Sequence, residues 1–300
     1  MEGLSGDALQ LLVNGLMAGA VLAVPAIGFT TIYAVLRFPN FAVGGMATVG
    51  AYAGWLANTW LGWPAPAALA AAFAAGAVIG LASDFLALRT LRPSRGGAGG
   101  VSGGALAAAI ASVALNIVIE NALRFVWGND PRGYDLPVYR DWRVADLRVG
   151  PQQLENAGLA AAAMAAVFLF LGFTRTGRMM RAVADNPQLA SLKGMDAGRV
   201  AMLATGLGMG LAGFGGMLIG LDTSIDPLTG YRVMLSVFAA AVVGGLGSVP
   251  GAVLGALVVG VGEEMSLLAL PPSYRTAIGF AAILLVLSFR PRGLLGERAF

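Results

Sequence analysis

The chain has 300 residues, of which 57% are hydrophobic and 12% charged, and its formal net charge is +3. A mean hydropathy of +0.77, together with continuous apolar runs of about 20 residues, exceeds what a soluble core requires and predicts a helical membrane protein. The chain contains no His and no Cys, which excludes zinc held by the usual ligands, thiol nucleophiles and imidazole bases. We therefore expect no catalytic residues and no metal site.

Other features exclude further classes of protein. The positive charge is thin and lies beside the apolar runs, so membrane lipid and not nucleic acid is the expected partner. Lys193, the single Lys, lies between Leu192 and Gly194, so the end of a phosphate-binding loop is absent, and we expect no cofactor on this chain. Glu2 and Asp7 precede the first apolar run without any basic residue. This pattern differs from a cleaved signal and predicts a retained membrane helix.

Apolar runs of about the length of a membrane span follow one another along the first two thirds of the chain. The run that begins at residue 41 is unusually rich in Gly and other small residues, which let helices approach closely in lipid. Residues 128–153 are polar and are expected to form an extracytoplasmic loop, and the Gly-rich residues 96–104 a flexible connector. The predicted spans are residues 9–36, 41–60, 65–88, 105–127, 154–173 and 200–221.

Three polar residues inside the fourth run, Asn116, Glu120 and Arg124, are spaced four apart and so share one face of a helix. Such a face is expected to point into protein or water and not into lipid. An ion pair between Glu120 and Arg124 that holds two helices together is the favoured interpretation. Direct contact with a solute is the alternative.

The densest charge lies in residues 175–199, between two long apolar runs, and its basic character predicts a cytoplasmic location. Residues 177–184 can form an amphipathic helix, while Asn186 and Pro187 are typical of the start of a second helix, whose end Gly194 marks. The sequence thus predicts a compact unit of two short helices. The alternative is a solvated loop that only anchors its flanking spans. The basic residues are Arg175, Arg178, Arg181, Lys193 and Arg199.

The last third of the chain contains one unusually short run. Residues 233–246 supply only about 14 apolar residues, short for a full span. If this run crosses the membrane, the chain makes nine passages, and if it re-enters, eight. The tail carries Arg290, Arg292 and Arg298 against one Glu, which favours crossing or a broken helix, with the N-terminus outside. The predicted fold is a single all-α polytopic membrane domain over residues 1–300, with eight or nine transmembrane helices, some broken or re-entrant.

Several stretches carry a resemblance to a known family. GRMMRAVADNPQLASLKGMD, at residues 177–196, resembles the cytoplasmic coupling segment of permease subunits in ABC importers for branched-chain (hydrophobic) amino acids and amides. Residues 15–52, GGLGSVPGAVLGALVVGVGEE at 244–264 and RPRGLLG at 290–296 agree with it. The resemblance covers nearly the whole chain and is greatest for the shorter of the family's two permease types, which pairs with a different permease.

The resemblance implies a multi-pass protein of the bacterial inner membrane with several partners. They are a second permease subunit, two cytoplasmic ATPase subunits that hold the ATP and Mg, and a periplasmic solute-binding protein. The coupling segment would dock into a groove on an ATPase subunit, where Arg178 or Arg181 could pair with acidic groups. Anionic lipid headgroups are the alternative partners of both side chains. The implied contact residues are Gly177, Arg178, Arg181, Ala182, Asp185, Asn186, Pro187 and Gly194.

The resemblance also marks a translocation path and gate. In NFAVGG, residues 40–45, the family usually has a His and an acidic residue where this chain has Val43 and Gly45, so its choice of solute is open to difference. The two glycines of this stretch are equally well interpreted as helix packing. The glycines of GGLGSVPG fit a tight backbone crossing near the gate or a plain interhelical turn. The implied residues are Asn40, Phe41, Gly44, Asn116, Glu120, Gly244, Gly245, Gly247 and Gly251.

The function implied is inward translocation of a branched-chain or other hydrophobic amino acid by alternating access. The chain itself would not be an enzyme, because its partner subunits would hydrolyse the ATP. One alternative is a urea or short-chain amide ABC permease, since close relatives carry such solutes. Another is an ion-coupled secondary transporter or channel, for which Glu120 is the candidate buried carboxylate. An intramembrane enzyme is disfavoured, because the sequence has no visible cluster of bases or metal ligands.

Overall fold

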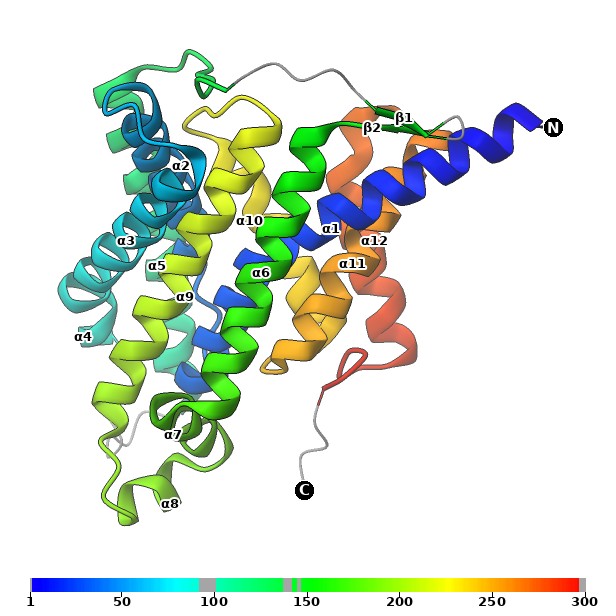
Figure 1. Cartoon of the computed structure of the whole chain (residues 1–300). Helices are drawn as coiled ribbons and strands as arrows, with labels where there is room; N and C mark the ends of the chain where they lie inside the picture. Colours follow the sequence, from blue (N-terminus) through cyan, green and yellow to red (C-terminus); the bar gives the residue numbers. More distant parts are fainter. Residues whose placement is uncertain (1, 92–100, 137–141, 145–146, 297–300) are drawn as a thin grey trace.

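The computed structural model describes residues 2–91, 101–136, 142–144 and 147–296. Over these residues the chain is a bundle of tilted helices with one short hairpin, and most of the long helices run between the same two ends of the molecule (Figure 1). The prediction of an all-α polytopic membrane protein is confirmed. Most of the predicted connector at residues 96–104 lies outside the described residues, and so does Arg298 of the basic tail.

The helices follow the predicted runs closely. The long helices are α1 (Glu2–Leu36), α2 (Ala42–Thr59), α3 (Ala65–Ser83), α5 (Val101–Trp127), α6 (Pro151–Phe173), α9 (Ala197–Asp222), α10 (Thr229–Gly244), α11 (Val249–Met265) and α12 (Arg275–Phe289). The short elements are a π-helical turn (Asp84–Leu88) that joins α3 to α4 (Arg89–Leu91), β1 (Trp142–Val144), β2 (Leu147–Val149), α7 (Arg175–Asp185), α8 (Pro187–Leu192) and 3-10 turns at Ser266–Leu268 and Pro272–Tyr274.

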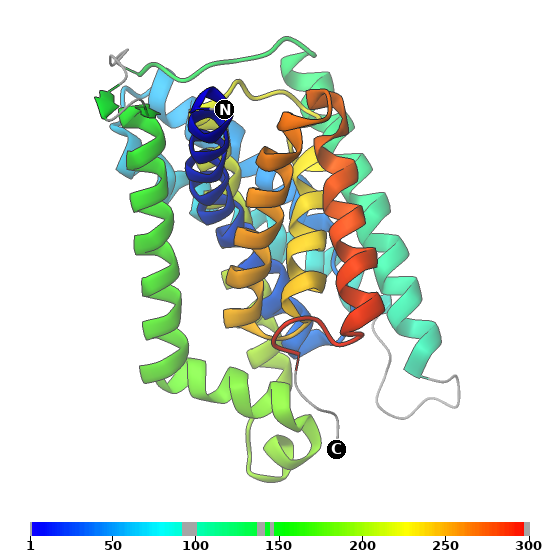
Figure 2. The same cartoon turned by 90° about the vertical axis from the view of Figure 1, so that its right-hand side faces the viewer.

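The start of α1 and the segment that follows α12 lie at opposite ends of the bundle (Figure 1, Figure 2). The β1–β2 hairpin lies at the end where α1 starts, whereas α7 and α8 lie at the other end together with the basic tail. A chain whose two ends lie on opposite sides passes through the bundle an odd number of times. If the basic tail lies inside, the N-terminus lies outside, as predicted from the sequence. We call the end that carries α7 and α8 the cytoplasmic end, because basic segments remain on the inner side of the membrane.

Six helical segments among the described residues are long and apolar enough to cross a membrane, namely α1, α3 with its continuation to Leu91, α5, α6, α9, and α11 with its continuation to Leu268. The helix α2 has 18 residues, most of them buried within the protein. The helix α10 has 16 residues, or about 24 Å, which is less than the roughly 30 Å of a bilayer core. It nevertheless connects the extracytoplasmic loop at Ile225 to the cytoplasmic end, where Leu294 N donates to Val243 O. The run predicted at residues 233–246 therefore belongs to a short helix that runs between the two ends of the bundle, while the number of membrane crossings stays a prediction.

The centre of the bundle is formed by α1, α2 and α9, whose small residues bring backbones into contact. A Cβ added at Gly50 of α2 would lie 2.2 Å from the Cα atom of Gly213 in α9. A Cβ added at Gly216 would lie 2.0 Å from the carbonyl oxygen of Ala47. Because no real Cβ contact is this short, glycine sets the distance between α2 and α9.

The residues between α5 and α6 lie at the extracytoplasmic end, as predicted, but they include ordered structure. The strands β1 and β2 pair in antiparallel fashion, and Arg132 exchanges two backbone hydrogen bonds of 2.8 Å with Ile225. The Tyr134 hydroxyl donates to the carbonyl oxygen of Ala51 at 2.8 Å, and burial raises the pKa of that hydroxyl. This loop is thereby tied to the middle of α2 and to the segment that follows α9.

Replacing Gly50 by Ala is expected to destabilise the protein, because the added methyl group would overlap backbone atoms of α9. We expect a loss on the order of 1–3 kcal/mol. Gly158→Ala in α6 is the matched control, since nothing lies within 4 Å of the added Cβ and Ala favours a helix over Gly by about 1 kcal/mol. Thermal unfolding in detergent, followed by circular dichroism, measures both variants. Equal midpoints would contradict a backbone contact at Gly50.

Candidate functional site

The charged segment between α6 and α9 folds into two short helices, as predicted (Figure 1). Thr174 Oγ1 accepts a hydrogen bond from Gly177 N at 3.0 Å and caps α7. Asn186 Oδ1 accepts from two backbone amides of α8 at 3.1 and 2.9 Å, and Pro187 follows at the first helical position, where its missing N–H has no cost. Gly194, with a φ of 80°, ends the unit.

The helix α7 packs closely against the end of α6. Its apolar residues Met180 and Val183 are buried, and a Cβ at Gly177 would lie 2.4 Å from the carbonyl oxygen of Phe170. Gly177 therefore serves packing within the chain, while other predicted contact residues face outward. Arg178, Arg181, Asp185, Asn186 and Gly194 are exposed, and Ala182 and Pro187 are half-buried.

Leu189 and Leu192 form an exposed apolar tip on α8. They were not identified from the sequence, because the prediction was based on the charged residues of this segment. Their side chains are 53% and 85% exposed, beside the exposed Lys193. Bulky apolar groups that lie outside both the membrane and the protein core are typical of a binding surface. The signal in the sequence is the presence of leucines within a segment that charge places outside the membrane.

A second candidate region begins where α1 ends. Arg37 has a φ of 59°, in the left-handed region that non-glycine residues adopt rarely, and the chain is then non-helical as far as Phe41. The Arg37 guanidinium donates a hydrogen bond to the carbonyl oxygen of Ala184 in α7. Phe38, the next residue, is buried. This interruption connects the cytoplasmic unit to the interior of the bundle.

The helix α2 begins inside the bundle, next to the middle of α5. Phe41 N donates to Ser112 Oγ at 2.9 Å, and Ala42 N donates to Asn40 Oδ1 at 3.1 Å. Asn40 and Ser112 are both buried, and among the described residues Asn40 Nδ2 has no hydrogen-bond partner. Two buried polar side chains therefore satisfy the first amides of α2.

Gly44 lies where α2, α5 and α10 meet. A Cβ added there would lie 2.8 Å from the carbonyl oxygen of Gly230 and 3.2 Å from Asn116 Oδ1. A Cβ added at Gly45 would lie 3.0 Å from the same Asn116 oxygen, so a carboxylate side chain at Gly45 would have to displace Asn116. Of the sequence-predicted residues, the structure brings Gly44 and Asn116 together here, while Asn40 and Phe41 lie at the start of the same helix.

Three phenylalanine rings join α1, α2 and α10 at the interruption. The ring centroids of Phe41 and Phe238 are 5.4 Å apart, and Phe29 meets Phe238 edge-on at 6.0 Å. Such pairs contribute about 0.5–1.5 kcal/mol each beyond the area they bury. Phe29 is buried, whereas Phe41 and Phe238 are only partly buried, so the rings form a partly covered aromatic cluster beside the start of α2.

Glu120 and Arg124 form an ion pair of 2.8 Å, and their side chains are 15% and 35% exposed. Both residues belong to α5, one turn apart. The prediction that this pair holds two helices together is therefore wrong. Contact with a solute, the alternative, stays a prediction.

The glycines of GGLGSVPG lie apart from the α2 interruption, in the cytoplasmic turn between α10 and α11. Gly245 and Gly247 have φ values of 108° and 94°, which glycine adopts readily. A Cβ at Gly244 would lie 2.0 Å from the carbonyl oxygen of Gly251. The segment after α12 covers the turn through backbone hydrogen bonds of 2.8 and 2.9 Å. The geometry is that of an interhelical turn, and a gating role stays a prediction.

The loop before α10 is anchored by Asp226. Its backbone N–H donates to Thr229 Oγ1 at 2.9 Å, and its carboxylate accepts from that hydroxyl at 3.0 Å and pairs with Arg232. Burial alone would raise the pKa of Asp226, but the hydrogen bonds from Arg232 and Thr229 outweigh burial and hold the pKa below its usual range. The charged carboxylate thus fixes the start of α10 and places Gly230 against α2.

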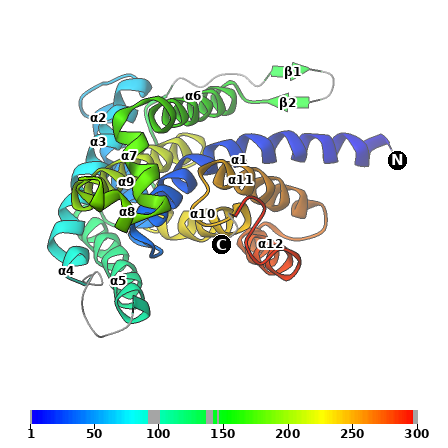
Figure 3. The same cartoon turned by 90° about the horizontal axis from the view of Figure 1, so that it is seen from below.

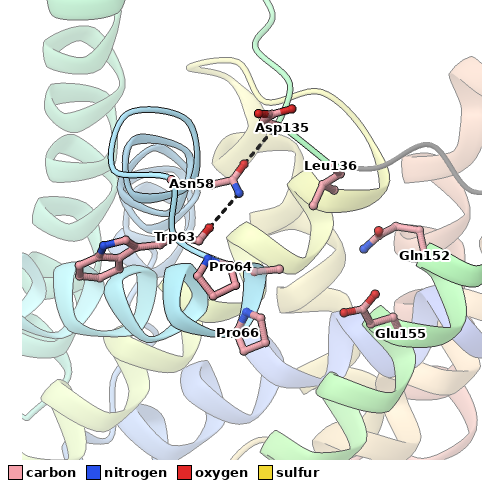
Figure 4. Close-up of a pocket in the computed structure, with 10 residues that line it drawn as sticks. Asn58, Trp63, Pro64, Pro66, Asp135, Leu136, Gln152 and Glu155 are labelled. Atoms are coloured by element: carbon pink, nitrogen blue, oxygen red, sulfur yellow. Dashed lines mark hydrogen bonds between the residues drawn. The ribbon is translucent and has the colours of Figure 1, made fainter.

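The extracytoplasmic end carries polar hollows. One of about 400 Å³ lies between the α2–α3 turn and the start of α6 (Figure 4). Asp135 N donates to Asn58 Oδ1 at 2.8 Å, and Asn58 Nδ2 donates to the carbonyl oxygen of Trp63 at 3.1 Å. Gln152 and Glu155 of α6 face these residues across the hollow. A second hollow of about 480 Å³ shares Gln152.

Comparisons with known proteins agree on one family. The sequence model described as "Branched-chain amino acid transport system / permease component" matches residues 11–287. The high-affinity branched-chain amino acid transport system permease proteins BraD of Pseudomonas aeruginosa and LivH of Escherichia coli are 31% and 30% identical to this chain, over 96% of each protein. A probable branched-chain amino acid transport permease protein LivH of Methanocaldococcus jannaschii is 26% identical over 96% of this chain and 92% of its own length.

Among solved structures, the fold resembles PsaBC from Streptococcus pneumoniae in complex with Fab. The TM-score is 0.51, the sequence identity 14%, and the match covers 97% of both chains. At this identity the likeness concerns the fold alone.

Replacing Ser112 by Ala is expected to leave the buried amide of Phe41 without an acceptor and to lower the free energy of unfolding by about 1–3 kcal/mol. Ser288→Ala is the matched control, because that exposed hydroxyl bonds only the carbonyl oxygen of Leu284 in its own helix. Thermal unfolding midpoints in detergent provide the measurement. A Ser112 variant as stable as the Ser288 variant would show that the start of α2 does not depend on this hydrogen bond.

Proposed function

Because the chain belongs to the family of permease components of branched-chain amino acid transport systems, we propose that it moves a branched-chain or other hydrophobic amino acid inward as one membrane subunit of an ABC importer. The observation that carries this proposal is the family match over nearly the whole chain. The described helices are consistent with a multi-pass protein of the inner membrane. The chain is a transport permease and works with ABC partner components.

The partners fall into three kinds. We propose that a second, different permease completes the transmembrane unit, that two cytoplasmic ATPase subunits bind and hydrolyse the ATP with Mg, and that a periplasmic solute-binding protein delivers the amino acid. The polar hollow beside Asn58 and Glu155 opens on the face opposite α7 and α8. Its hydrogen-bonding groups are suited to a protein that docks from the outside.

The α7–α8 unit is the proposed contact with an ATPase subunit. It is capped at both helix starts, packs against α6 at Gly177, buries Met180 and Val183, and presents exposed Arg178 and Arg181 to a partner. Guanidinium groups favour paired contacts with carboxylates, and the apolar tip at Leu189 and Leu192 adds area that is removed from water on binding. A rigid unit of this kind can transmit a partner's movement without deforming.

The proposed path runs along the start of α2. Gly44 and Asn116 lie together there, with Asn40 at the start of the same helix, and the rings of Phe41 and Phe238 form the proposed apolar constriction on the cytoplasmic side of Gly44. Polar groups at a helix interruption offer hydrogen bonds to the solute's charged groups, and the rings accept its hydrocarbon side chain. Alternating access then requires the rings to separate.

Replacing Leu192 by Asp is expected to weaken association with the ATPase subunits about tenfold, because a charge would replace an apolar contact at the tip of α8. The side chain is 85% exposed, so the fold should be unaffected. Leu61→Asp is the control, at a residue that is 63% exposed on the opposite face. Co-purification of tagged complexes measures the association. Undiminished recovery of the ATPase subunits with the Leu192 variant would remove the tip from the contact.

Proteoliposomes that contain this chain and its co-purified partners should accumulate radiolabelled leucine when ATP and the binding protein are supplied. The chain alone should not, because it contains no phosphate-binding loop. Uptake by the chain alone would contradict the ABC assignment. Uptake of urea or a short amide without uptake of leucine would overturn the proposed solute.

A further inference from the structure

One flank of α5 carries the residues Asn116, Glu120 and Arg124. Viewed down the axis of α5, Asn116 is rotated by about 60° from Ile119. Glu120 is rotated by about 40° further in the same direction, and Arg124 by about 40° more. Each step also rises about 6 Å toward the extracytoplasmic end. The three side chains therefore form a slanting series along one side of α5.

This flank faces α10. A Cβ at Gly45 would contact both Asn116 and Ile119, whereas a Cβ at Gly44 would contact Asn116 on one side and Gly230 of α10 on the other. Asn116 thus lies on the α10 side of α5, and Glu120 and Arg124 lie further toward that side. The helix α5 packs mainly on α2 and stands at the edge of the bundle (Figure 3). The pair accordingly lies beside the middle of α2, between the levels of Gly45 and Tyr52, on the open side of α5 toward α10.

The charged groups of Glu120 and Arg124 are not fully covered by the rest of the protein. Glu120 and Arg124 lie within a membrane-spanning helix, where charged groups face protein or a water-filled cavity and not lipid. Both side chains remain partly exposed. Among the described residues, Arg124 Nε is buried and has no hydrogen-bond partner, so one donor of the guanidinium is unused. An unused buried donor beside an accessible carboxylate is an incomplete polar site.

We propose that Glu120 and Arg124 together bind the zwitterionic head of the amino acid as it enters the path. The solute's carboxylate accepts hydrogen bonds from the Arg124 guanidinium, Nε included, and its ammonium group donates to the Glu120 carboxylate. Because the two protein charges lie side by side at 2.8 Å, a ligand with adjacent opposite charges matches them, whereas an uncharged amide does not. This inference rests on the proposed function and names the residues that select the solute's charge.

The same placement gives an order of contacts. The ion pair lies one and two helical turns above Asn116, and Asn116 contacts Gly44 near the aromatic cluster at Phe41. A solute that arrives from the extracytoplasmic end would therefore meet the charged pair first. Its hydrocarbon side chain would reach the rings afterwards.

The test uses the complete importer with its binding protein in proteoliposomes and radiolabelled leucine as the probe. Glu120→Gln and Arg124→Gln should each lower the maximal uptake rate about tenfold, as expected for losing a charged hydrogen bond. Asn121→Ala is the control on the adjacent position, since Asn121 bonds only its own helix at 2.8 Å. That variant should transport at the wild-type rate.

Two further variants separate binding from a structural ion pair. Combining Glu120→Arg with Arg124→Glu restores the pair along α5 but reverses it, and uptake should stay about tenfold low. Arg124→Lys keeps the charge and the pairing but removes Nε, and uptake should fall several-fold. Wild-type uptake by either variant would overturn the proposal. Absence of leucine uptake by the unmodified importer would instead refute the proposed function, so the two failures are distinguishable.

Discussion

Backbone amides inside a membrane cannot reach water, and this constraint governs where α2 starts. A buried donor without a partner costs roughly 2–7 kcal/mol on transfer scales, so a helix that begins within the bundle needs acceptors from the protein. Ser112 and Asn40 supply them to Phe41 and Ala42. The contact of α2 with α10, and the position of the aromatic rings, both follow from α2 starting at this depth.

Small residues then hold the interrupted helix in place. Gly50 and Gly213 bring the backbones of α2 and α9 into contact, and dispersion between close backbones is a main source of helix association in lipid. Helices in such contact have little freedom to slide. The helix α5 differs, because it packs mainly on α2 and leaves its charged flank open. The bundle thus combines a closely packed centre with an edge helix that has one open flank.

Features with local causes could be predicted from the sequence, whereas those that depend on tertiary packing could not. The apolar runs, the two helices joined at Asn186 and Pro187, and the end of that unit at Gly194 follow from length, capping and glycine conformation. The depth at which α2 begins depends on Ser112, a residue 71 positions away, and no local pattern reveals it. The exposure of Leu192 could not be predicted either, because the side of an amphipathic helix that is buried depends on the helix it packs against.

The ion pair of α5 illustrates a different limit. The four-residue spacing of Glu120 and Arg124 was enough to place them on one face of a helix, but spacing alone does not say which neighbour that face meets. The contacts of Gly44 and Gly45 with Asn116 settle the direction. Gly44 and Gly45, which have no reactive side chain, thus show on which side of α5 the charged residues lie.

The Arg37 guanidinium rests on the carbonyl oxygen of Ala184, near the end of α7. Arg37 is also the residue at which α1 gives way to the non-helical turn before α2. The hydrogen bond thus joins the α7–α8 unit at the cytoplasmic end to the residues that lead to Phe41 and its ring contacts. Because α7 also packs against α1 and α9, this hydrogen bond adds a polar contact to an apolar one, and the α7–α8 unit and the turn before α2 are held together at the cytoplasmic end by both.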